Sequence, residues 1–218
     1  MPAGGSYATT SAAHEALVNP VRVDPATVSI RAESARPSYC SGATYLVFLK
    51  TLGDLQKSGA LRLSRTQWES LVPGPLPDGH GIWGRWNANG PGTARLFHEL
   101  GLGRNFTSFE EARPGDFLKI FWTDAVGKNE RGHSVIFLGT ETRDGSEYVR
   151  FWSSNKPGGY GEKSVPRTKI ARALFSRLET PQNLALIDQL PPADSYLASL
   201  LRTESSFAEA CKLTGTTR

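Results

Sequence analysis

Cysteine, histidine and long apolar runs are all scarce in this 218-residue chain, and each shortage excludes a class of protein. Two distant cysteines, Cys40 and Cys211, are too few for a disulfide framework. The four histidines form no cluster with them, so we expect no structural zinc site and no other metal or cofactor. No segment reaches the length of a transmembrane helix, and we therefore expect no stable membrane insertion.

A block of basic residues is also missing. The 25 Lys and Arg residues exceed the 21 Asp and Glu residues by only four, and both kinds are dispersed along the chain. Nucleic-acid-binding domains usually concentrate positive charge on one face, so no nucleic-acid partner is expected. The same mild positive charge is compatible with attraction to an anionic polymer such as a cell wall. The first residues lack the basic-then-apolar pattern of a signal peptide.

What is present suffices for one sizeable domain, because 39% of the residues are hydrophobic and 10% are aromatic. Residues 1–20 are rich in Ala, Ser, Thr and Gly, and their composition predicts a flexible N-terminal arm. Residues 21–165 are expected to form the core. Residues 166–218 are expected to form a helical C-terminal extension packed on that core. We expect the protein to be a monomer.

The pattern of apolar residues predicts helices first and consecutive strands afterwards, which is typical of an α+β fold. A Gly-rich and Trp-rich loop is expected over 73–92. The pair Asp144-Gly145 is a strong hairpin signal between the last two expected strands, and the three strands should form an antiparallel meander. Helices are expected over 38–57, 64–71, 93–100, 169–178, 194–202 and 205–213, and strands over 116–122, 134–139 and 147–152.

Cys40 is the most informative single residue, because it directly precedes the apolar run 45–49 and lies in the first turn of the first expected helix. Unpaired backbone N–H groups and the positive end of the helix dipole stabilise a thiolate at that position. Cysteine hydrolases place their nucleophile at such a site. The alternative is a small buried apolar residue, which is the common role of a cysteine outside a disulfide.

A cysteine nucleophile needs a base, and His133 at the start of the second expected strand is the best candidate. A third polar group usually orients the imidazole. Asn155 is the obvious candidate at the end of the third strand, and Ser153 is the alternative one pleat away on the same strand face. The oxyanion would be stabilised by the Cys40 backbone N–H and one further donor.

Three segments together resemble the NlpC-like and CHAP amidases of the papain-like superfamily. These are Tyr39-Cys40-Ser41-Gly42 opening a helix, 113–117 (Arg-Pro-Gly-Asp-Phe) opening a strand, and 132–139 (Gly-His-Ser-Val-Ile-Phe-Leu-Gly). The resemblance covers roughly residues 37–160 and implies a papain-like fold with the nucleophile helix packed on a central antiparallel sheet. NlpC-like members usually carry His as the third residue and CHAP members an acidic residue, whereas the matching strand here offers only Ser153 and Asn155.

The resemblance implies a cysteine amidase or endopeptidase that acts outside the cytoplasm on peptide amide bonds, often those of peptidoglycan. Two alternatives stay open. The same residues could transfer the acyl group to an amine or alcohol, as in a transglutaminase-like enzyme. The fold could instead serve as a non-catalytic polysaccharide-binding module. Trp83, Trp86 and Trp152 are candidates for substrate contact, and packing in the protein interior is the alternative role for the first two.

Overall fold

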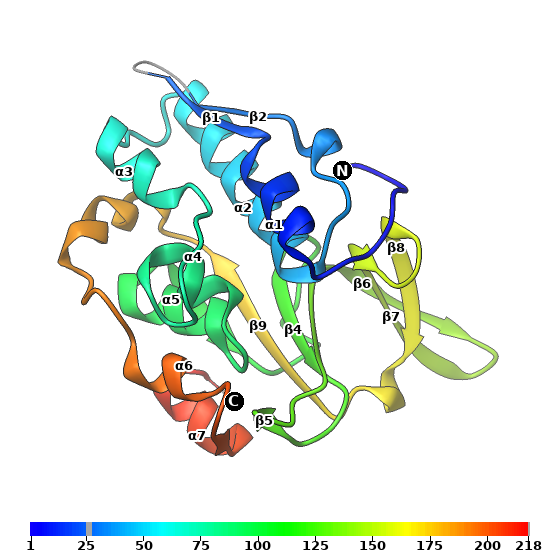
Figure 1. The fold of residues 1–218 in the computed structure, drawn as a ribbon. Coiled ribbons are helices and arrows are strands. Elements are labelled where there is room, and N and C mark those ends of the chain that lie inside the picture. The colour runs from blue at the N-terminus through cyan, green and yellow to red at the C-terminus, as the bar shows by residue number, and fades with distance from the viewer. Residues whose placement is uncertain (25–27, 218) are drawn as a thin grey trace.

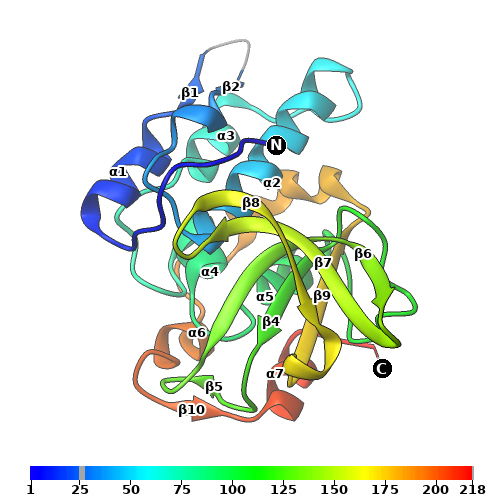
Figure 2. The same cartoon turned by 90° about the vertical axis from the view of Figure 1, so that its right-hand side faces the viewer.

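The structure is a computed structural model that describes residues 1–24 and 28–217, and its centre is a six-stranded antiparallel sheet (Figures 1 and 2). The spatial order of the strands is β3-β9-β4-β6-β7-β8. The expected meander is confirmed, because β4, β6 and β7 are consecutive neighbours in the sheet. The strands of this sheet are β3 (Gly103–Phe106), β4 (Phe117–Phe121), β6 (Gly132–Arg143), β7 (Ser146–Asn155), β8 (Gly159–Pro166) and β9 (Arg172–Leu178).

Most of the helices gather beside this sheet (Figure 1). Two small antiparallel pairs, β1 with β2 and β5 with β10, lie outside the main sheet. The helices are α1 (Ser11–Val18), α2 (Cys40–Lys57), α3 (Arg65–Leu71), α4 (Gly81–Asn87), α5 (Gly92–Leu100), α6 (Ser195–Ser199) and α7 (Phe207–Leu213). The 3₁₀ segments are η1 (Ala32–Ser34), η2 (Arg167–Lys169) and η3 (Pro181–Gln189), and the short strands are β1 (Val21–Val23), β2 (Val28–Ile30), β5 (Val126–Gly127) and β10 (Glu204–Ser205).

Helix α2 is the central helix of the molecule and fits its prediction closely. Its apolar residues from Tyr45 to Leu52 supply much of the largest hydrophobic cluster, which also contains Phe117, Ile136 and Trp152 of the sheet. Phe48 is fully buried and its ring stacks on that of Trp86 at a centroid distance of 4.9 Å. This burial holds the helix in place against the sheet, and its N-terminus is therefore held at a defined position.

Two predictions of secondary structure are wrong. The helix expected over 169–178 is instead η2 followed by β9, which pairs with both β3 and β4. Residues 172–178 are thus an internal strand of the sheet, and the C-terminal segment is not wholly helical. Arg177 of β9 donates two hydrogen bonds to the buried carboxylate of Asp116, at 2.8 and 2.7 Å. This bidentate ion pair joins β9 to the start of β4.

The loop expected over 73–92 contains helix α4, although Gly, Trp and Asn are weak helix formers. Ile82, Trp83 and Trp86 are each at most 3% exposed. The burial of these side chains against α2 therefore stabilises a helix that local propensity does not predict.

The N-terminal segment, expected from its composition to be a flexible arm, contains helix α1 and an extended part before it. That part forms backbone hydrogen bonds with two regions of the protein. Gly4 exchanges two of them with Tyr160 of β8, while Ser6 and Ala8 bond to Ser38 just before α2. Figure 2 shows this dark blue segment passing β8 and the start of α2 before it enters α1. Composition could not predict this placement, because the backbone itself makes these bonds.

Candidate active site

Cys40 is the first residue of α2, as predicted, and it is not part of a disulfide. Tyr39, in an extended conformation, caps the helix without a side-chain hydrogen bond, so the first-turn N–H groups remain available. The first turn is held from behind by Trp86, whose indole N–H lies 3.2 Å from the Ser41 carbonyl and 3.3 Å from the Thr44 hydroxyl. The thiol therefore lies at the positive end of a firmly held helix.

His133 lies next to the first residue of β6 and approaches Cys40 from the sheet. Its ring contacts those of Trp122, at a centroid distance of 6.4 Å, and Phe151, at 5.7 Å. The Cys40 thiol forms a side-chain hydrogen bond with His133. The second ring nitrogen, Nε2, lies 3.1 Å from Oδ1 of Asn155. The three predicted site residues, Cys40, His133 and Asn155, thus form one continuous chain of hydrogen bonds.

The hydrogen bonds of Asn155 define its orientation and the protonation of the histidine ring. Its amide nitrogen donates to the carbonyls of Ser153 and Gly161, at 3.1 and 2.8 Å. The amide oxygen therefore faces His133 and accepts a hydrogen bond from Nε2–H, which leaves Nδ1 to face the thiol. In most serine and cysteine hydrolases the third residue holds the imidazole in this way.

Ser153, the alternative third residue, has a different partner. Its hydroxyl donates to the backbone carbonyl of Ser134 at 2.7 Å. The reason lies in the strand pairing. β6 and β7 are paired from Ile136 and Trp152 to the hairpin turn, but not at the opposite ends of the two strands. They therefore separate where His133 and Asn155 lie. The Ser153 side chain bridges part of this gap, and the Asn155 side chain extends across it to the imidazole.

These neighbours change the acidity of Cys40. Burial alone would raise the pKa of its thiol, but the hydrogen bond and the positive charge of His133 lower it to about 6. The backbone N–H of Ser134 and the ammonium of Lys119 act in the same direction. A thiol with this pKa is mostly ionised at neutral pH, and the thiolate is the nucleophilic form.

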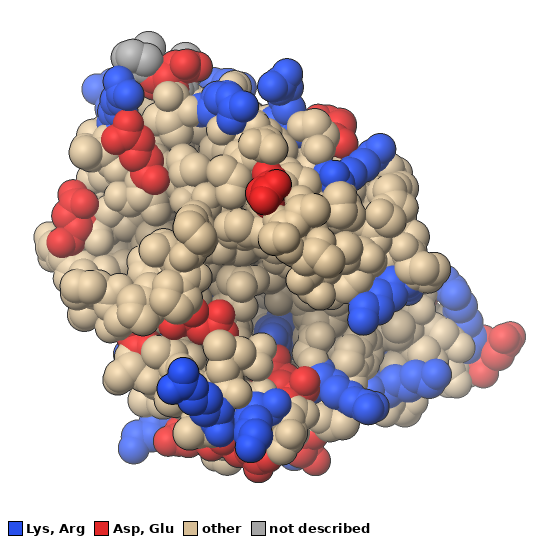
Figure 3. Space-filling view, in the orientation of Figure 1, with Lys and Arg blue, Asp and Glu red and all other residues tan. Residues whose placement is uncertain are grey.

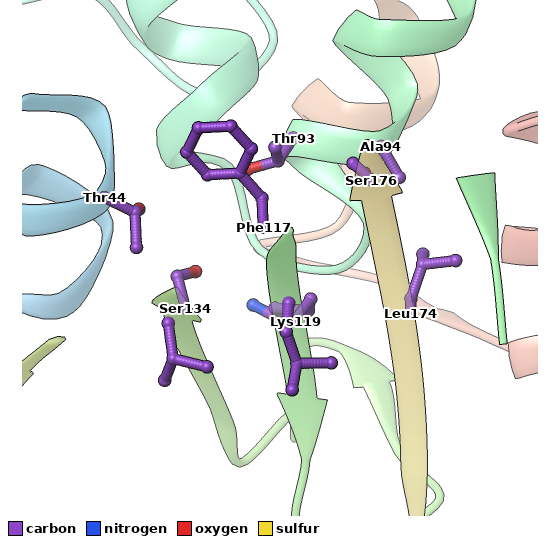
Figure 4. Close-up of a pocket in the computed structure, with 10 residues that line it drawn as sticks. Thr44, Thr93, Ala94, Phe117, Lys119, Ser134, Leu174 and Ser176 are labelled. Atoms are coloured by element: carbon purple, nitrogen blue, oxygen red, sulfur yellow. The ribbon is translucent and has the colours of Figure 1, made fainter. Parts of the chain in front are cut away.

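Lys119 is a member of the site that the sequence analysis did not identify. It is the only charged residue within β4 and pairs with Ser134 of β6 in the strand register. A single charge in an otherwise apolar strand is the sequence feature that could have identified it as a site residue. Its ammonium lies 2.5 Å from Oε1 of Glu130, which is 4% exposed. Figure 4 shows Lys119 and Ser134 on neighbouring strands with Thr44 of α2 facing them, around a gap of about 10 Å³ behind the site.

Tyr7 is a second residue that the sequence analysis missed, and no local pattern points to it. The N-terminal segment carries its hydroxyl to the Cys40 thiol, with which it forms a hydrogen bond. Burial raises the pKa of the Tyr7 phenol, and the nearby thiolate raises it further, so the phenol remains a proton donor. Tyr7 thus forms part of the wall of the cavity at the Cys40 thiol.

The three candidate substrate-binding tryptophans lie in the interior. Trp83 and Trp86 are each 2% exposed and pack against Tyr45 of α2 at centroid distances of 5.0 and 5.2 Å. Trp152 is 3% exposed, stacks on Tyr160 and donates to the Pro2 carbonyl at 3.1 Å. None of the three lines the described cavities at Cys40 and His133. The packing alternative therefore accounts for Trp83 and Trp86, and the same holds for Trp152.

A hollow on the face seen in Figure 3 lies between the helical half and the sheet, and both signs of charge occur along its lower edge. Within residues 1–24 and 28–217, no three His, Cys, Asp or Glu side chains are grouped so that they could hold a metal ion. No helix in this described part of the chain is both long and apolar enough to cross a bilayer. No protein-family model, curated protein or solved structure matches this chain.

Proposed function

We propose that the protein is a cysteine hydrolase that cleaves an amide bond through a thioester intermediate. One observation carries the proposal: the Cys40 thiol at the start of α2 bonds to His133, whose other nitrogen bonds to Asn155. A cysteine in the core with no catalytic role needs neither a base nor an orienting amide. This arrangement, together with a pKa of about 6, matches what nucleophilic catalysis by a thiol requires.

In the proposed reaction the Cys40 thiolate attacks the carbonyl carbon, and the negative charge moves to the carbonyl oxygen. The Cys40 backbone N–H, at the positive end of α2, is a donor for that oxygen. His133 then gives its proton to the leaving amine, and the C–N bond breaks to leave a thioester. A water molecule attacks the thioester after His133 removes its proton, which releases the acid and the thiol.

Peptide amides of peptidoglycan are the substrate class that we propose, and the support for this choice is the resemblance of three segments to NlpC-like and CHAP amidases. The papain-like classification and a site of action outside the cytoplasm have the same basis. The α+β architecture, with a helix that begins at the nucleophile beside an antiparallel sheet, is compatible with that resemblance.

Digestion of purified peptidoglycan, followed by mass spectrometry of the released peptides, tests the proposal. The wild type should release fragments with new amine and carboxyl termini, and Cys40→Ala should release none. Cys211→Ala is the matched control, because it removes the other thiol, which lines neither of the cavities at Cys40 and His133, and it should retain activity. Peptidoglycan left intact by the wild type would refute the substrate class. The hydrolase proposal itself fails if, in addition, iodoacetamide alkylates Cys40 no faster than an ordinary thiol at pH 7.

Acyl transfer remains an alternative with the same residues, and addition of an amine to the digestion distinguishes it. Amide products that form at the expense of the free acid would indicate a transferase. The polysaccharide-binding alternative relied on the Trp-rich segment, and the burial of Trp83 and Trp86 removes that support.

A further inference from the structure

Two cavities meet at the catalytic pair, and they are lined by different catalytic residues. The larger, about 600 Å³, is lined by Cys40 and Ser41 but not by His133. The smaller, about 330 Å³, is lined by His133 but not by Cys40. Tyr7 and Gly132 line both, so the two cavities adjoin each other beside Cys40 and His133.

This division assigns a direction to the substrate. A general acid must lie within hydrogen-bond reach of the atom that it protonates, so the leaving nitrogen must lie beside His133. The leaving amine fragment therefore extends into the smaller cavity, which we call the amine-side cavity. The acyl group, which is attached to the sulfur in the thioester, extends into the larger cavity along the start of α2, which we call the acyl-side cavity.

The amine-side cavity combines an apolar floor with positive charge. Trp122, Phe151 and Val165 supply the apolar surface, and Lys156 and Lys163 supply two ammonium groups. No Asp or Glu lines the described part of this cavity. In Figure 3 the side of the hollow toward β7 and β8 likewise shows mainly Lys and Arg side chains.

The two lysines are held at the cavity by contacts of their own. The Lys163 ammonium donates to the Lys156 carbonyl at 2.8 Å, and the Lys156 ammonium lies 5.2 Å from the centre of the Tyr7 ring. Neither lysine forms an ion pair with an acidic side chain in the described part of the protein. Their charges are therefore available to an anionic group of a bound molecule.

The acyl-side cavity has a different charge pattern. The Lys119 ammonium that lines it is neutralised by Glu130. Asp78 also lines it and accepts one hydrogen bond from the Asn89 backbone at 3.2 Å, but it forms no ion pair with any described Lys or Arg. The uncompensated charge is thus negative on the acyl side and positive on the amine side.

From these observations we infer, on the basis of the proposed function, that the amine-side cavity selects leaving fragments that carry a carboxylate near the scissile amide. An amino acid or short peptide with an apolar side chain and a free carboxylate has the matching chemistry. The carboxylate can be terminal or belong to a side chain, and the experiment below separates these two sources.

The test uses the reverse of amine release, so it needs no knowledge of the natural acyl group. The Cys40 thiolate attacks the carbonyl of p-nitrophenyl acetate, the ester C–O bond breaks and p-nitrophenolate leaves. An added dipeptide then competes with water for the acetyl thioester. Its amine nitrogen forms a C–N bond with the acetyl carbon, the C–S bond breaks, and His133 accepts the amine proton. Three acceptors are compared: Gly-Phe, Gly-Phe amide, and Gly-Glu amide, which has only a side-chain carboxylate.

Gly-Phe should intercept the acetyl-enzyme about tenfold better than its amide at low salt, because each exposed ion pair contributes at most about fivefold. Salt should reduce the preference. The double variant Lys156→Gln/Lys163→Gln should lose the preference, so that its rates with Gly-Phe and with Gly-Phe amide become equal. Lys57→Gln/Lys212→Gln, at exposed positions on α2 and α7, is the charge-matched control. If Gly-Glu amide reacts as fast as Gly-Phe, the cavity accepts a carboxylate from either source, terminal or side-chain.

Equal interception by Gly-Phe and its amide, or a preference that survives in the double variant, would overturn the inference but not the proposed function. Failure of Cys40 to become acetylated would instead refute the proposed function. In that case NMR titration of Cys40→Ala with the two dipeptides still decides the inference. Gly-Phe should shift the Trp122 indole signal at a lower concentration than its amide, and equal affinities would exclude a carboxylate site.

Discussion

The pKa of Cys40 depends on His133, and removal of the imidazole is the sharpest test of the site. In the wild type the thiol pKa of about 6 lies well below its ordinary value of 9.0, although burial by itself would raise it. His133→Ala removes the two largest stabilising contributions to the thiolate. The pKa should therefore return to about 9 or higher, a change of about 3 units or about 4 kcal/mol in the free energy of ionisation.

The predicted fraction of thiolate at pH 7 falls from about 90% to about 1% in this variant. The rate of alkylation at that pH changes less, because a thiolate of higher pKa is intrinsically more nucleophilic by about tenfold or more over this range. The midpoint of the pH profile is therefore the better measurement. Iodoacetamide labelling across pH 4–10, with peptide mapping to separate Cys40 from Cys211, gives that midpoint.

A midpoint near pH 6 in both wild type and His133→Ala would refute the assignment of His133 as the partner of the thiol. His98→Ala is the matched control, because His98 is exposed on α5, and it should keep the wild-type midpoint.

The lowered pKa of Cys40 also makes the free energy of unfolding depend on pH. A depressed thiol pKa stabilises the folded state fully above about pH 9, and this contribution is lost as the pH falls through about 6.

Four further variants test other residues of the site and the packing behind it. Asn155→Ala should lower kcat by about 10- to 100-fold with little change in KM, because the imidazole loses the acceptor that orients it. Ser153→Ala should keep nearly full kcat. Steady-state kinetics in which Ser153→Ala loses more kcat than Asn155→Ala would contradict the assignment of Asn155 as the third residue. Tyr7→Phe should raise the Cys40 midpoint by roughly one pH unit, since a hydrogen bond to a charged group contributes about 1.5–3 kcal/mol, and an unchanged midpoint in the labelling assay would remove Tyr7 from the site. Trp86→Ala should lower the free energy of unfolding, measured with urea, by about 3–5 kcal/mol. A variant that is as stable as the wild type and loses only substrate affinity would instead support a role of Trp86 in substrate contact.

Local sequence patterns predicted the elements whose stability is local. Helix α2 has a continuous apolar run, α3 has a Ser64/Gln67 capping box that the structure contains, and the β6–β7 hairpin has Asp144-Gly145 at its turn. Asp144 and Gly145 both have positive φ angles, of 49° and 72°, as a two-residue hairpin turn of this kind requires. In each case neighbouring residues in the chain carry the information.

The errors occurred where distant contacts override local preference. The segment Arg172–Leu178 contains several good helix formers, and both of its faces are buried, so it shows no alternation of polar and apolar residues. Its strand conformation comes from pairing with β3 and β4, which neighbouring residues cannot encode. Helix α4 shows the converse, since its helical state depends on the burial of two tryptophans against α2.

The sequence by itself determined that Cys40 begins a buried helix and that His133 and Asn155 lie on neighbouring strands, because helix and strand periodicity are local properties. Only the tertiary structure decided which groups meet. The packing of α2 on the sheet brings the thiol to the imidazole, and the separation of β6 from β7 selects Asn155 over Ser153. Backbone bonds to β8 and to Ser38 place Tyr7 at the thiol. These are contacts between residues far apart in the chain, and their geometry exists only once the whole sheet has formed.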